Sequence, residues 1–400
     1  MEKTKKKAVG IIAEYNPFHN GHKYHLQRSL TGTGAEISIA VISGNFTQRG
    51  NLSILDKWSR AEMAVKNGVN LVVEMPVMFA CNNAGYFAKS GVEILENLGV
   101  DYISFGSESG NIDTLKHISR EMKNNREEIG LRIKESVKEG LAYPRARHEA
   151  IIDIIGEDAG EIIDSPNNLL ALEYLKYIKK AEPVTVKRQG TGYYDLEPKG
   201  GMASATGIRK MMSQGLDISD LVPDVSLEIL RQNIDKLSGE EKLYPMLIQK
   251  ILSSSADELN SIFGSEEGLG NKMKNQVRYW KNYDDMVDGL KSKRYTRTRI
   301  GRLLALSLMG IQRQDVKAAK NYIRVLAFDT EGSAYLKYIK NNGSCSLPII
   351  TNINKEAGNY PEIIPTVEKD VLAGDLFNFA CNRDLYQFSE YVMRPIFVNR

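Results

Sequence analysis

The first hundred residues of the chain alternate short runs of β-branched apolar residues with longer segments in which apolar residues recur at helical spacing. The apolar runs are predicted to be buried strands and cover residues 9–13, 37–43, 71–74 and 102–105. Between them, amphipathic helices are predicted at residues 21–29, 57–67 and 84–98. Because strands that alternate with helices at this interval require right-handed crossovers, the pattern predicts a parallel sheet. We therefore expect a Rossmann-like, doubly wound α/β domain.

From residue 112 onward the pattern is mainly helical. Helices are predicted at residues 112–143 and 167–180, and a strand at 184–187 precedes a glycine-rich loop at 190–201. Signals for strands stop after about residue 215. The later segments with helical patterns are 227–262, 271–290 and 302–307. The sequence thus predicts two domains, an α/β catalytic domain over residues 1–215 and a mainly α-helical domain over residues 216–400.

Composition excludes several classes of protein. With 42% apolar and 26% charged residues the chain is predicted to bury a full core, and no apolar run approaches the roughly 18 residues that cross a bilayer. The apolar run at residues 8–13 is too short for a secretory signal, so we expect a cytoplasmic protein with no membrane partner. Cys81, Cys345 and Cys381 are scattered, which argues against disulfides and structural zinc. Because the net charge is only +3, any nucleic-acid contact must come from a local cluster.

Three of the five histidines, His19, His22 and His25, fall within seven residues. They follow the first predicted strand, where the chain turns into a helix as His19-Asn-Gly21-His22. Glycine allows the backbone to approach a ligand, a helix start offers unpaired N–H groups, and imidazoles three residues apart share one face. Such a corner suits a polyphosphate. Two histidines that donate to the α- and β-phosphates of ATP favour nucleotidyl transfer.

Two other interpretations of the histidines compete with this one. A single histidine after a strand is usually a surface residue or a helix cap. This explanation is weak for two histidines with a glycine between them. A zinc site is disfavoured because a helix turns by about 100° per residue, so His19 and His25 diverge. Glu14 is the one acidic or cysteine side chain near them. No resident metal is therefore predicted.

A second anion-binding element follows the glycine-rich loop as Ser204-Ala-Thr206-Gly-Ile-Arg209. Two hydroxyls at a helix start, with an arginine one turn later, suit the β- and γ-phosphates of a nucleotide. Taken alone, such a motif is more often a plain helix cap. Combined with the histidine motif, it predicts an ATP site.

Several longer phrases resemble those of one family. They include Glu14-Tyr-Asn-Pro-Phe-His-Asn-Gly-His22 and Ser43-Gly-Asn-Phe-Thr-Gln-Arg-Gly50, with residues 56–64, 105–108, 165–168 and 187–188. The chain resembles the tRNA(Met) cytidine acetate ligase family of HIGH-type nucleotidyltransferases, closely over residues 8–210 and more loosely beyond. The resemblance implies an enzyme that uses ATP to activate acetate as acetyl-adenylate. It then implies acetylation of N4 of the wobble cytidine of elongator tRNA(Met), which gives N4-acetylcytidine.

The same resemblance implies the residues of the site. His19 and His22 would face the phosphates as the catalytic pair. The ATP-binding residues would be Ile12, Ala13, Glu14, Tyr15, Asn16, Pro17, Phe18, His19, Asn20, Gly21, His22, Lys23, Tyr24, His25, Gly106, Asn167 and Arg188, joined by Ser204, Thr206 and Arg209. Asn167 could instead be a helix cap, and Asn168 is the alternative ATP contact. Arg188 could instead be a charged side chain in solvent. Magnesium is expected on the ATP phosphates.

A basic segment in the second half of the chain is the candidate contact with tRNA. Residues 291–302 hold six lysines and arginines with an interposed tyrosine. The predicted tRNA-binding residues are Lys293, Arg294, Tyr295, Arg297 and Arg299. Basic side chains neutralise phosphates, and a tyrosine can stack on an unpaired base. The alternative is an ordinary solvated helix face. Arg145 and Arg147 form a smaller candidate patch.

Two other functions stay open at this point. An adenylyltransferase acting on a small phosphorylated metabolite needs the same ATP corner but no tRNA. A non-catalytic nucleotide- or RNA-binding protein would share the scaffold, although the intact His19, His22 and Arg209 argue against it. The residues do not single out a general base for acylation of N4, for which Glu14 and His25 are the two candidates. Selectivity for acetate rests on the resemblance alone, and the oligomeric state is not predicted.

Overall fold

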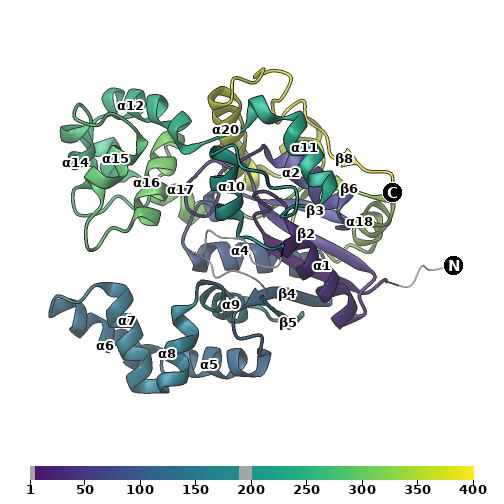
Figure 1. Ribbon diagram of the computed structural model, residues 1–400, viewed down its shortest axis with the longest axis horizontal. Coiled ribbons are helices and arrows are strands. Elements are labelled where there is room, and N and C mark those ends of the chain that lie inside the picture. Colours follow the sequence, from purple (N-terminus) through teal and green to yellow (C-terminus); the bar gives the residue numbers. More distant parts are fainter. Residues whose placement is uncertain (1–4, 189–200) are drawn as a thin grey trace.

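A single sheet runs through the protein, whose computed structural model describes residues 5–188 and 201–400 (Figure 1). Within these residues the sheet has eight strands in the order β5-β4-β1-β2-β3-β6-β7, and β8 pairs with β6. The strands are β1 (Ala8–Ala13), β2 (Ile37–Ser43), β3 (Leu71–Met75), β4 (Tyr102–Ser107), β5 (Glu182–Lys187), β6 (Ile323–Phe328), β7 (Ile349–Ile350) and β8 (Ile396–Phe397). Each of the strands β1 to β5 is parallel to the strands of this group that it pairs with.

The five predicted strands and the doubly wound parallel sheet are confirmed. Residues 190–200 of the predicted glycine-rich loop lie outside the described part of the chain.

The prediction that strands stop after about residue 215 is wrong. β6 pairs antiparallel with β3, and β7 and β8 both pair with β6. Five of the six residues of β6 are buried, and a short apolar run of this kind cannot be distinguished from a buried helical segment by periodicity. The strand forms because β3 offers a free edge, which is a tertiary condition. The sheet therefore takes strands from both halves of the chain, and the division into domains at residue 215 stays a prediction.

Helices make up most of the remaining structure. In the first half they are α1 (Asn20–Thr33), α2 (Lys57–Lys66), α3 (Val77–Ala80), α4 (Ala84–Asn97), α5 (Ile112–Asn124), α6 (Arg126–Lys138), α7 (Tyr143–Ile155), α8 (Glu157–Asp164), α9 (Pro166–Tyr177) and α10 (Ala205–Ser213). In the second half they are α11 (Asp224–Gln232), α12 (Tyr244–Ser253), α13 (Ala256–Ser261), α14 (Leu269–Gln276), α15 (Tyr283–Leu290), α16 (Arg297–Met309), α17 (Arg313–Ala318), α18 (Thr330–Asn342), α19 (Ile353–Glu356) and α20 (Ile364–Ala380). Short 3₁₀ helices cover Ile234–Lys236, Glu240–Leu243, Ala357–Asn359 and Pro361–Ile363. The helix predicted at 112–143 is two helices, because Asn125 ends α5 and precedes α6.

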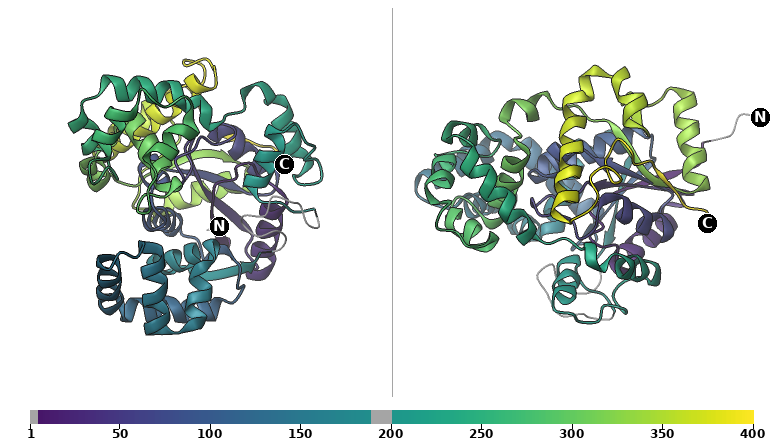
Figure 2. Two further views of the ribbon diagram at one scale, coloured as in Figure 1. Left: turned by 60° about the vertical axis from the view of Figure 1, so that its left-hand side comes forward. Right: turned by 90° about the horizontal axis from the view of Figure 1, so that it is seen from above.

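Helices cover both faces of the sheet, as Figure 2 shows. Ile39 and Val41 of β2 belong to the apolar cluster that includes α4 and α18. Ala40 and Ile42 point the other way, into the cluster with α1, α2 and α11. Side chains of a β-strand point alternately to the two faces of the sheet. Because both faces are buried here, most residues of these strands are apolar.

Two helical bodies extend beyond the sheet (Figure 2). α5 to α8 lie on the side of β4 and β5, whereas α12 to α17 form a separate apolar cluster with α20. Phe46 and Leu52, which flank the loop after β2, are part of that second cluster. The loop is therefore held between the sheet and the second helical body. Among the described helices, none has both the length and the apolar character needed to cross a membrane.

Candidate active site

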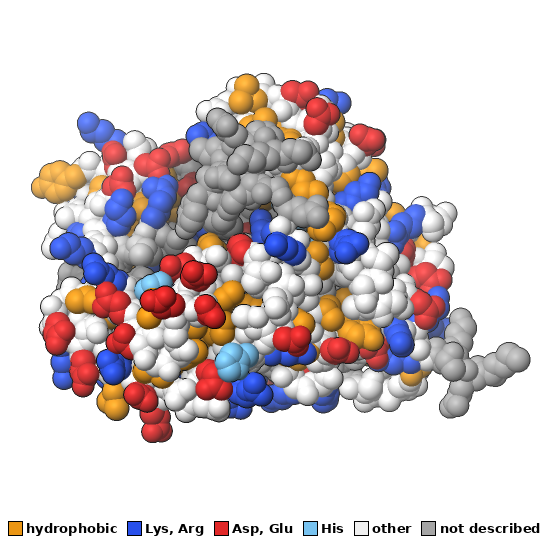
Figure 3. Space-filling model, turned by 60° about the horizontal axis from the view of Figure 1, so that its bottom comes forward, with side chains coloured by type: hydrophobic (Ala, Val, Ile, Leu, Met, Phe, Trp, Pro, Cys, Tyr) orange, Lys and Arg blue, Asp and Glu red, His pale blue; other side chains and the backbone are white. Residues whose placement is uncertain are grey.

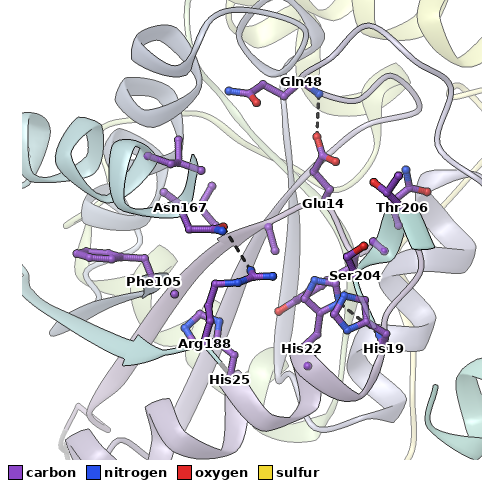
Figure 4. A pocket seen from close by; sticks show the side chains of 18 of the residues that line it. Glu14, His19, His22, His25, Gln48, Phe105, Asn167, Arg188, Ser204 and Thr206 are labelled. Atoms are coloured by element: carbon purple, nitrogen blue, oxygen red, sulfur yellow. Dashed lines mark hydrogen bonds between the residues drawn. The ribbon is translucent and has the colours of Figure 1, made fainter. Parts of the chain in front are cut away.

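Loops and helix starts at the carboxyl ends of β1, β4 and β5 enclose a cavity of about 280 Å³ (Figure 4). Ligands of parallel α/β sheets bind at this edge. The predicted ATP-binding residues that line the cavity are Ile12, Ala13, Glu14, Tyr15, Asn16, His19, Gly21, His22, Tyr24, His25, Gly106, Asn167, Arg188, Ser204, Thr206 and Arg209. The structure thus brings together two motifs that lie about half the chain apart.

Four of the predicted ATP-binding residues do not line the cavity. Pro17 and Phe18 are buried in the core. The side chain of Asn20 donates to the carbonyl oxygens of Gly201 and Asp220, at 3.2 and 2.8 Å. Lys23 is exposed on α1. All four lie within the continuous range of residues that was predicted to bind ATP. A turn followed by a helix points only some of its side chains toward the cavity, so a continuous range includes residues that face elsewhere.

The turn before α1 sets the positions of the two predicted catalytic histidines. The backbone N–H of His19 donates to Nδ1 of His22 at 3.3 Å. The two rings stack with their centroids 3.7 Å apart. A side chain at Gly21 would come within 2.9 Å of the ring of His19, which explains the glycine between them. Because Nδ1 of His22 accepts, a neutral ring carries its proton on Nε2.

Burial keeps the histidines of the cavity neutral. It lowers the pKa of His19 to about 3, and the guanidinium groups of Arg188 and Arg209 add to the effect. Burial also holds the pKa of His22 well below its ordinary value, with His19 and His25 contributing. Burial and Arg188 lower the pKa of His25 to about 4. At neutral pH each imidazole therefore carries one N–H donor and no charge, which also permits the close stacking of His19 on His22.

Tyr15 holds an unpartnered polar atom in the cavity wall. Its side chain is 1% exposed, and its ring meets that of His22 edge-on at 4.9 Å. The hydroxyl is buried and has no hydrogen-bond partner among the described residues. A buried donor of this kind costs free energy unless a ligand pairs with it. The residue also adopts a φ of 48°, which is uncommon for a non-glycine residue and typical of functional turns.

Arg188 and Asn167 form the opposite part of the wall, as Figure 4 shows. Nη1 of Arg188 donates to the side-chain oxygen of Asn167 at 3.3 Å. The amide of Asn167 in turn donates to Glu108 at 2.6 Å. Asn168 is 2% exposed, does not line the cavity, and accepts from the backbone N–H groups of Glu108 and Ser109. Geometry therefore favours Asn167 over Asn168 as the ligand contact.

We expect different results when Asn167 and Asn168 are each replaced by alanine. Asn167→Ala removes a polar group of the cavity and is expected to raise the KM for ATP with little change in stability. Asn168→Ala leaves two part-buried N–H groups unpaired and is expected to lower the free energy of unfolding by about 1–3 kcal/mol. ATP titrations and denaturant unfolding of both variants measure the two effects. Equal effects of both variants on KM would contradict the assignment.

The start of α10 brings the second predicted motif to the cavity. Oγ of Ser204 accepts from the backbone N–H of Gly207 at 3.1 Å, so this serine is a helix cap as well as a lining residue. Arg209 donates to the carbonyl oxygen of Asn16 at 2.7 Å and to the hydroxyl of Thr206 at 3.3 Å. Arg209 thus ties α10 to the turn that carries the histidines.

Two parts of the cavity wall are not among the predicted residues. The loop after β2 contributes Thr47, Gln48, Arg49 and Asn51. An apolar part comes from Phe87, Phe105, Leu170 and Tyr174, and the remaining lining residues are Val186, Lys187, Met202, Ala203 and Ala205. The loop was identifiable in principle, because it follows a predicted parallel strand whose carboxyl end faces the same edge. The apolar part carries no local signal in the sequence.

The basic segment at the start of α16 is paired with acidic residues of neighbouring helices and loops. Arg294 contacts Glu267 at 2.8 Å, Arg297 forms an ion pair with Asp284, and Arg299 contacts Glu266 at 2.5 Å. These pairs are partly exposed to solvent. On the face of the molecule in Figure 3, acidic and basic side chains are likewise interspersed among the described residues. The segment is therefore not an open basic stripe.

The ring of Tyr295 lies in the apolar cluster of the second helical body. Tyr295 is 6% exposed, and the guanidinium of Arg299 lies 4.4 Å from the centre of its ring. The ring is therefore covered in this conformation, and contact of Tyr295 with tRNA stays a prediction.

The chain matches the family model of the HIGH Nucleotidyl Transferase over residues 6–390. The tRNA(Met) cytidine acetate ligase of Thermoanaerobacter sp. (strain X514) is 40% identical over 387 residues, covering 93% of this chain and 95% of the relative. The protein of the same name from Caldicellulosiruptor saccharolyticus is 36% identical over 408 residues, covering 98% and 99%. The crystal structure of apo Thermotoga maritima TmcAL has a TM-score of 0.90 at 30% identity, covering 98% of this chain and 100% of that one. The same protein bound with alpha-thio ATP has a TM-score of 0.89 at 30% identity and the same coverage.

Proposed function

Because the chain belongs to the tRNA(Met) cytidine acetate ligase family of HIGH-type nucleotidyltransferases, we propose that it activates acetate with ATP and acetylates N4 of the wobble cytidine of elongator tRNA(Met). The products are N4-acetylcytidine, AMP and pyrophosphate. A cytoplasmic location is proposed with this function, since ATP and tRNA meet there. The observation that carries the proposal is the cavity in which two neutral, stacked histidines and two arginines from distant segments meet.

In the first half-reaction an acetate oxygen attacks the α-phosphorus of ATP and pyrophosphate leaves. We propose that the N–H groups of His19 and His22 donate to the phosphate oxygens, with Arg188 and Arg209 balancing the negative charge. Neutral imidazoles suit this task, because a donor that is preorganised and shielded from water stabilises charge without reorganisation. The cavity wall made by Phe87, Phe105, Leu170 and Tyr174 supplies an apolar surface, which suits a base such as adenine.

Magnesium is proposed to accompany ATP rather than to occupy a protein site of its own. Among the described residues, no group of three or more histidine, cysteine, aspartate or glutamate side chains is placed to hold a metal ion. Mg²⁺ commonly binds through substrate phosphates and several waters. The ion would supply charge neutralisation on the phosphates, while the histidines and arginines hold the nucleotide in place.

In the second half-reaction N4 of cytidine attacks the acetyl carbonyl and AMP leaves. The amine of cytosine is delocalised into the ring and is a weak nucleophile, so a mixed anhydride with AMP is the kind of donor it requires. A wobble base is unpaired in the free anticodon loop, which keeps the cost of extruding it small. Lys293, Arg294, Arg297 and Arg299 are proposed to contact the tRNA backbone. The three arginines would exchange their carboxylate partners for phosphates.

Removing two of these arginines is expected to weaken tRNA binding. In the double variant Arg294→Ala with Arg297→Ala, the affinity for tRNA falls and the salt dependence of binding becomes shallower by about one unit of slope for each lost phosphate contact. Acetate-dependent pyrophosphate exchange, which needs no tRNA, checks that the protein is folded. The matched control is Lys337→Ala with Lys340→Ala, which removes two exposed lysines from α18, on the other side of the molecule (Figure 1). Unchanged tRNA affinity in the arginine variant would show that the segment is a solvated helix face.

The experiment that tests the proposed function combines the protein with ATP, acetate and bulk tRNA. Digested nucleosides are analysed by mass spectrometry for N4-acetylcytidine. Formation that depends on both ATP and acetate supports the proposal. If no acetylcytidine forms and pyrophosphate is released only with a small phosphorylated acceptor, the protein is a metabolite adenylyltransferase instead.

A further inference from the structure

Glu14 is the one acidic side chain among the described residues that line the cavity. The lysine and arginine residues of the wall are Arg49, Lys187, Arg188 and Arg209. A carboxylate repels the phosphates of a nucleotide. Direct contact with the phosphates of ATP therefore does not explain why this position holds an acidic residue.

Glu14 is fixed on one side and open on the other. Its carbonyl oxygen accepts from Nη1 of Arg60 at 2.5 Å, and its Oε1 accepts from the backbone N–H of Gln48 at 2.8 Å. Arg60 is fully buried and also donates to the carbonyl oxygens of Ser43 and Leu55, so the backbone at this point is held firmly. No described residue donates to Oε2 of Glu14. One carboxylate oxygen is thus left to meet a ligand.

The two half-reactions differ in whether they need a base. Acetate is already a carboxylate at neutral pH, so its attack on the α-phosphorus removes no proton. In the transfer step the bond from N4 to the acetyl carbon forms and the bond from that carbon to the AMP oxygen breaks. The amine then has one proton too many, and a base must accept it. A base in this cavity therefore has a task only in the transfer step.

The other candidate groups in the cavity are already engaged or poorly suited. Nε2 of His25 is already hydrogen-bonded to Oγ of Ser104 at 3.0 Å. Nδ1 of His22 accepts from the backbone of His19. Burial raises the pKa of the Tyr15 hydroxyl above its ordinary value, so it is a donor and not a base. Nδ1 of His19 has no hydrogen-bond partner among the described residues, but burial lowers the pKa of this histidine to about 3. Glu14 is the one carboxylate among the described residues of the cavity wall, and its Oε2 is an open acceptor.

The position of Glu14 also faces the side from which tRNA is proposed to arrive. Figure 4 shows its carboxylate pointing away from His19 and His22, toward the loop that contains Gln48. That loop packs closely on α16, since a side chain at Gly50 would overlap the backbone of Gly301. The first turn of α16 carries Arg297 and Arg299, two of the proposed tRNA-binding arginines. The histidines and Glu14 thus lie on opposite sides of the cavity, the first toward the phosphates and the second toward the acceptor.

We propose that Glu14 is the general base of acetyl transfer, with Oε2 accepting the proton that N4 of the acceptor cytosine loses. AMP leaves with the electrons of the broken bond, and the proton passes from Glu14 to water. The assignment rests on the proposed function and names the residue that serves its second half-reaction.

The variant Glu14→Gln tests this role. Glutamine keeps the shape of the side chain and an oxygen that accepts from the N–H of Gln48, but it is not a base. Transfer of acetyl from enzyme-bound acetyl-adenylate to tRNA, measured in a single turnover, is expected to fall by about 100-fold or more, and acetate-dependent pyrophosphate exchange by much less. The retained exchange shows that the variant is folded. Glu14→Asp keeps a carboxylate with a shorter reach and is expected to retain part of the transfer rate.

The matched control is Glu36→Gln, which makes the same change at an exposed residue just before β2. It is expected to alter neither half-reaction. Wild-type transfer rates in Glu14→Gln would overturn the role of Glu14, as would an equal loss of exchange and transfer, which would place the residue at ATP or its magnesium ion. A wild-type protein that shows neither acetate-dependent exchange nor acetylation of tRNA would overturn the proposed function and the role of Glu14 with it.

Discussion

Replacing His22 with alanine is expected to lower acetate-dependent pyrophosphate exchange by about 100- to 1,000-fold, the usual loss when a preorganised donor to a transition-state charge is removed. His22 lies in the cavity wall with its ring stacked on His19 at 3.7 Å. Because the pKa of His22 is held well below its ordinary value, the ring stays neutral and donates one N–H at working pH. The variant loses that donor and the ring that holds His19 in place.

A second variant separates these two losses. His22→Asn is expected to keep an acceptor for the backbone N–H of His19, which lies 3.3 Å from Nδ1 in the native protein. It lacks the imidazole donor, so exchange is expected to stay low while the turn before α1 is retained. His117→Ala, at an exposed position of α5, serves as the matched control and is expected to behave as the wild type. Normal exchange in both His22 variants would rule out a role for this residue in adenylate formation.

Replacing Lys57 with methionine is expected to lower the free energy of unfolding by about 3–5 kcal/mol, because removing one partner leaves buried charge uncompensated. Nζ of Lys57 lies 2.5 Å from Glu74 and 2.9 Å from Glu390, and all three side chains are at most 4% exposed. Burial works against the charge of Lys57, but the carboxylates of Glu390 and Glu74 outweigh it and raise its pKa above the ordinary value. The group joins α2 and β3 to a residue near the end of the chain.

Lys66→Met is the matched control, since it makes the same change on the same helix. Lys66 is 40% exposed and pairs with Glu62 one turn away. Exposed pairs of this kind contribute about 0–1 kcal/mol, so the control is expected to unfold at nearly the wild-type denaturant concentration. Denaturant unfolding of both variants gives the comparison. An equal decrease in the free energy of unfolding in the two variants would show that the burial of Lys57 does not determine its contribution to stability.

Two features of the site could not be predicted from the sequence: which of two adjacent asparagines lines the cavity, and which charges pair with the basic segment. Asn167 and Asn168 both follow a proline at a helix start, and only Asn167 lines the cavity. The difference comes from Glu108, a residue of the loop after β4 that accepts from the side chain of Asn167 and the backbone of Asn168. Likewise, the basic segment of α16 is neutralised by carboxylates on other elements. The spacing of residues in the sequence does not predict which hydrogen-bond or ion-pair partners a loop will have in the folded protein.

The sequence by itself determined the five parallel strands and the histidine turn. These features depend on periodicity and on contacts between near neighbours, such as the hydrogen bond from His19 to His22. Tertiary structure alone decided that β6 joins the free edge of β3, that an apolar wall completes the cavity, and that Glu14 faces away from the histidines. These outcomes depend on which edges, apolar faces and charges meet across long stretches of chain. Their energies come from pairs of residues that are far apart in the sequence, and local pattern carries no record of such pairs.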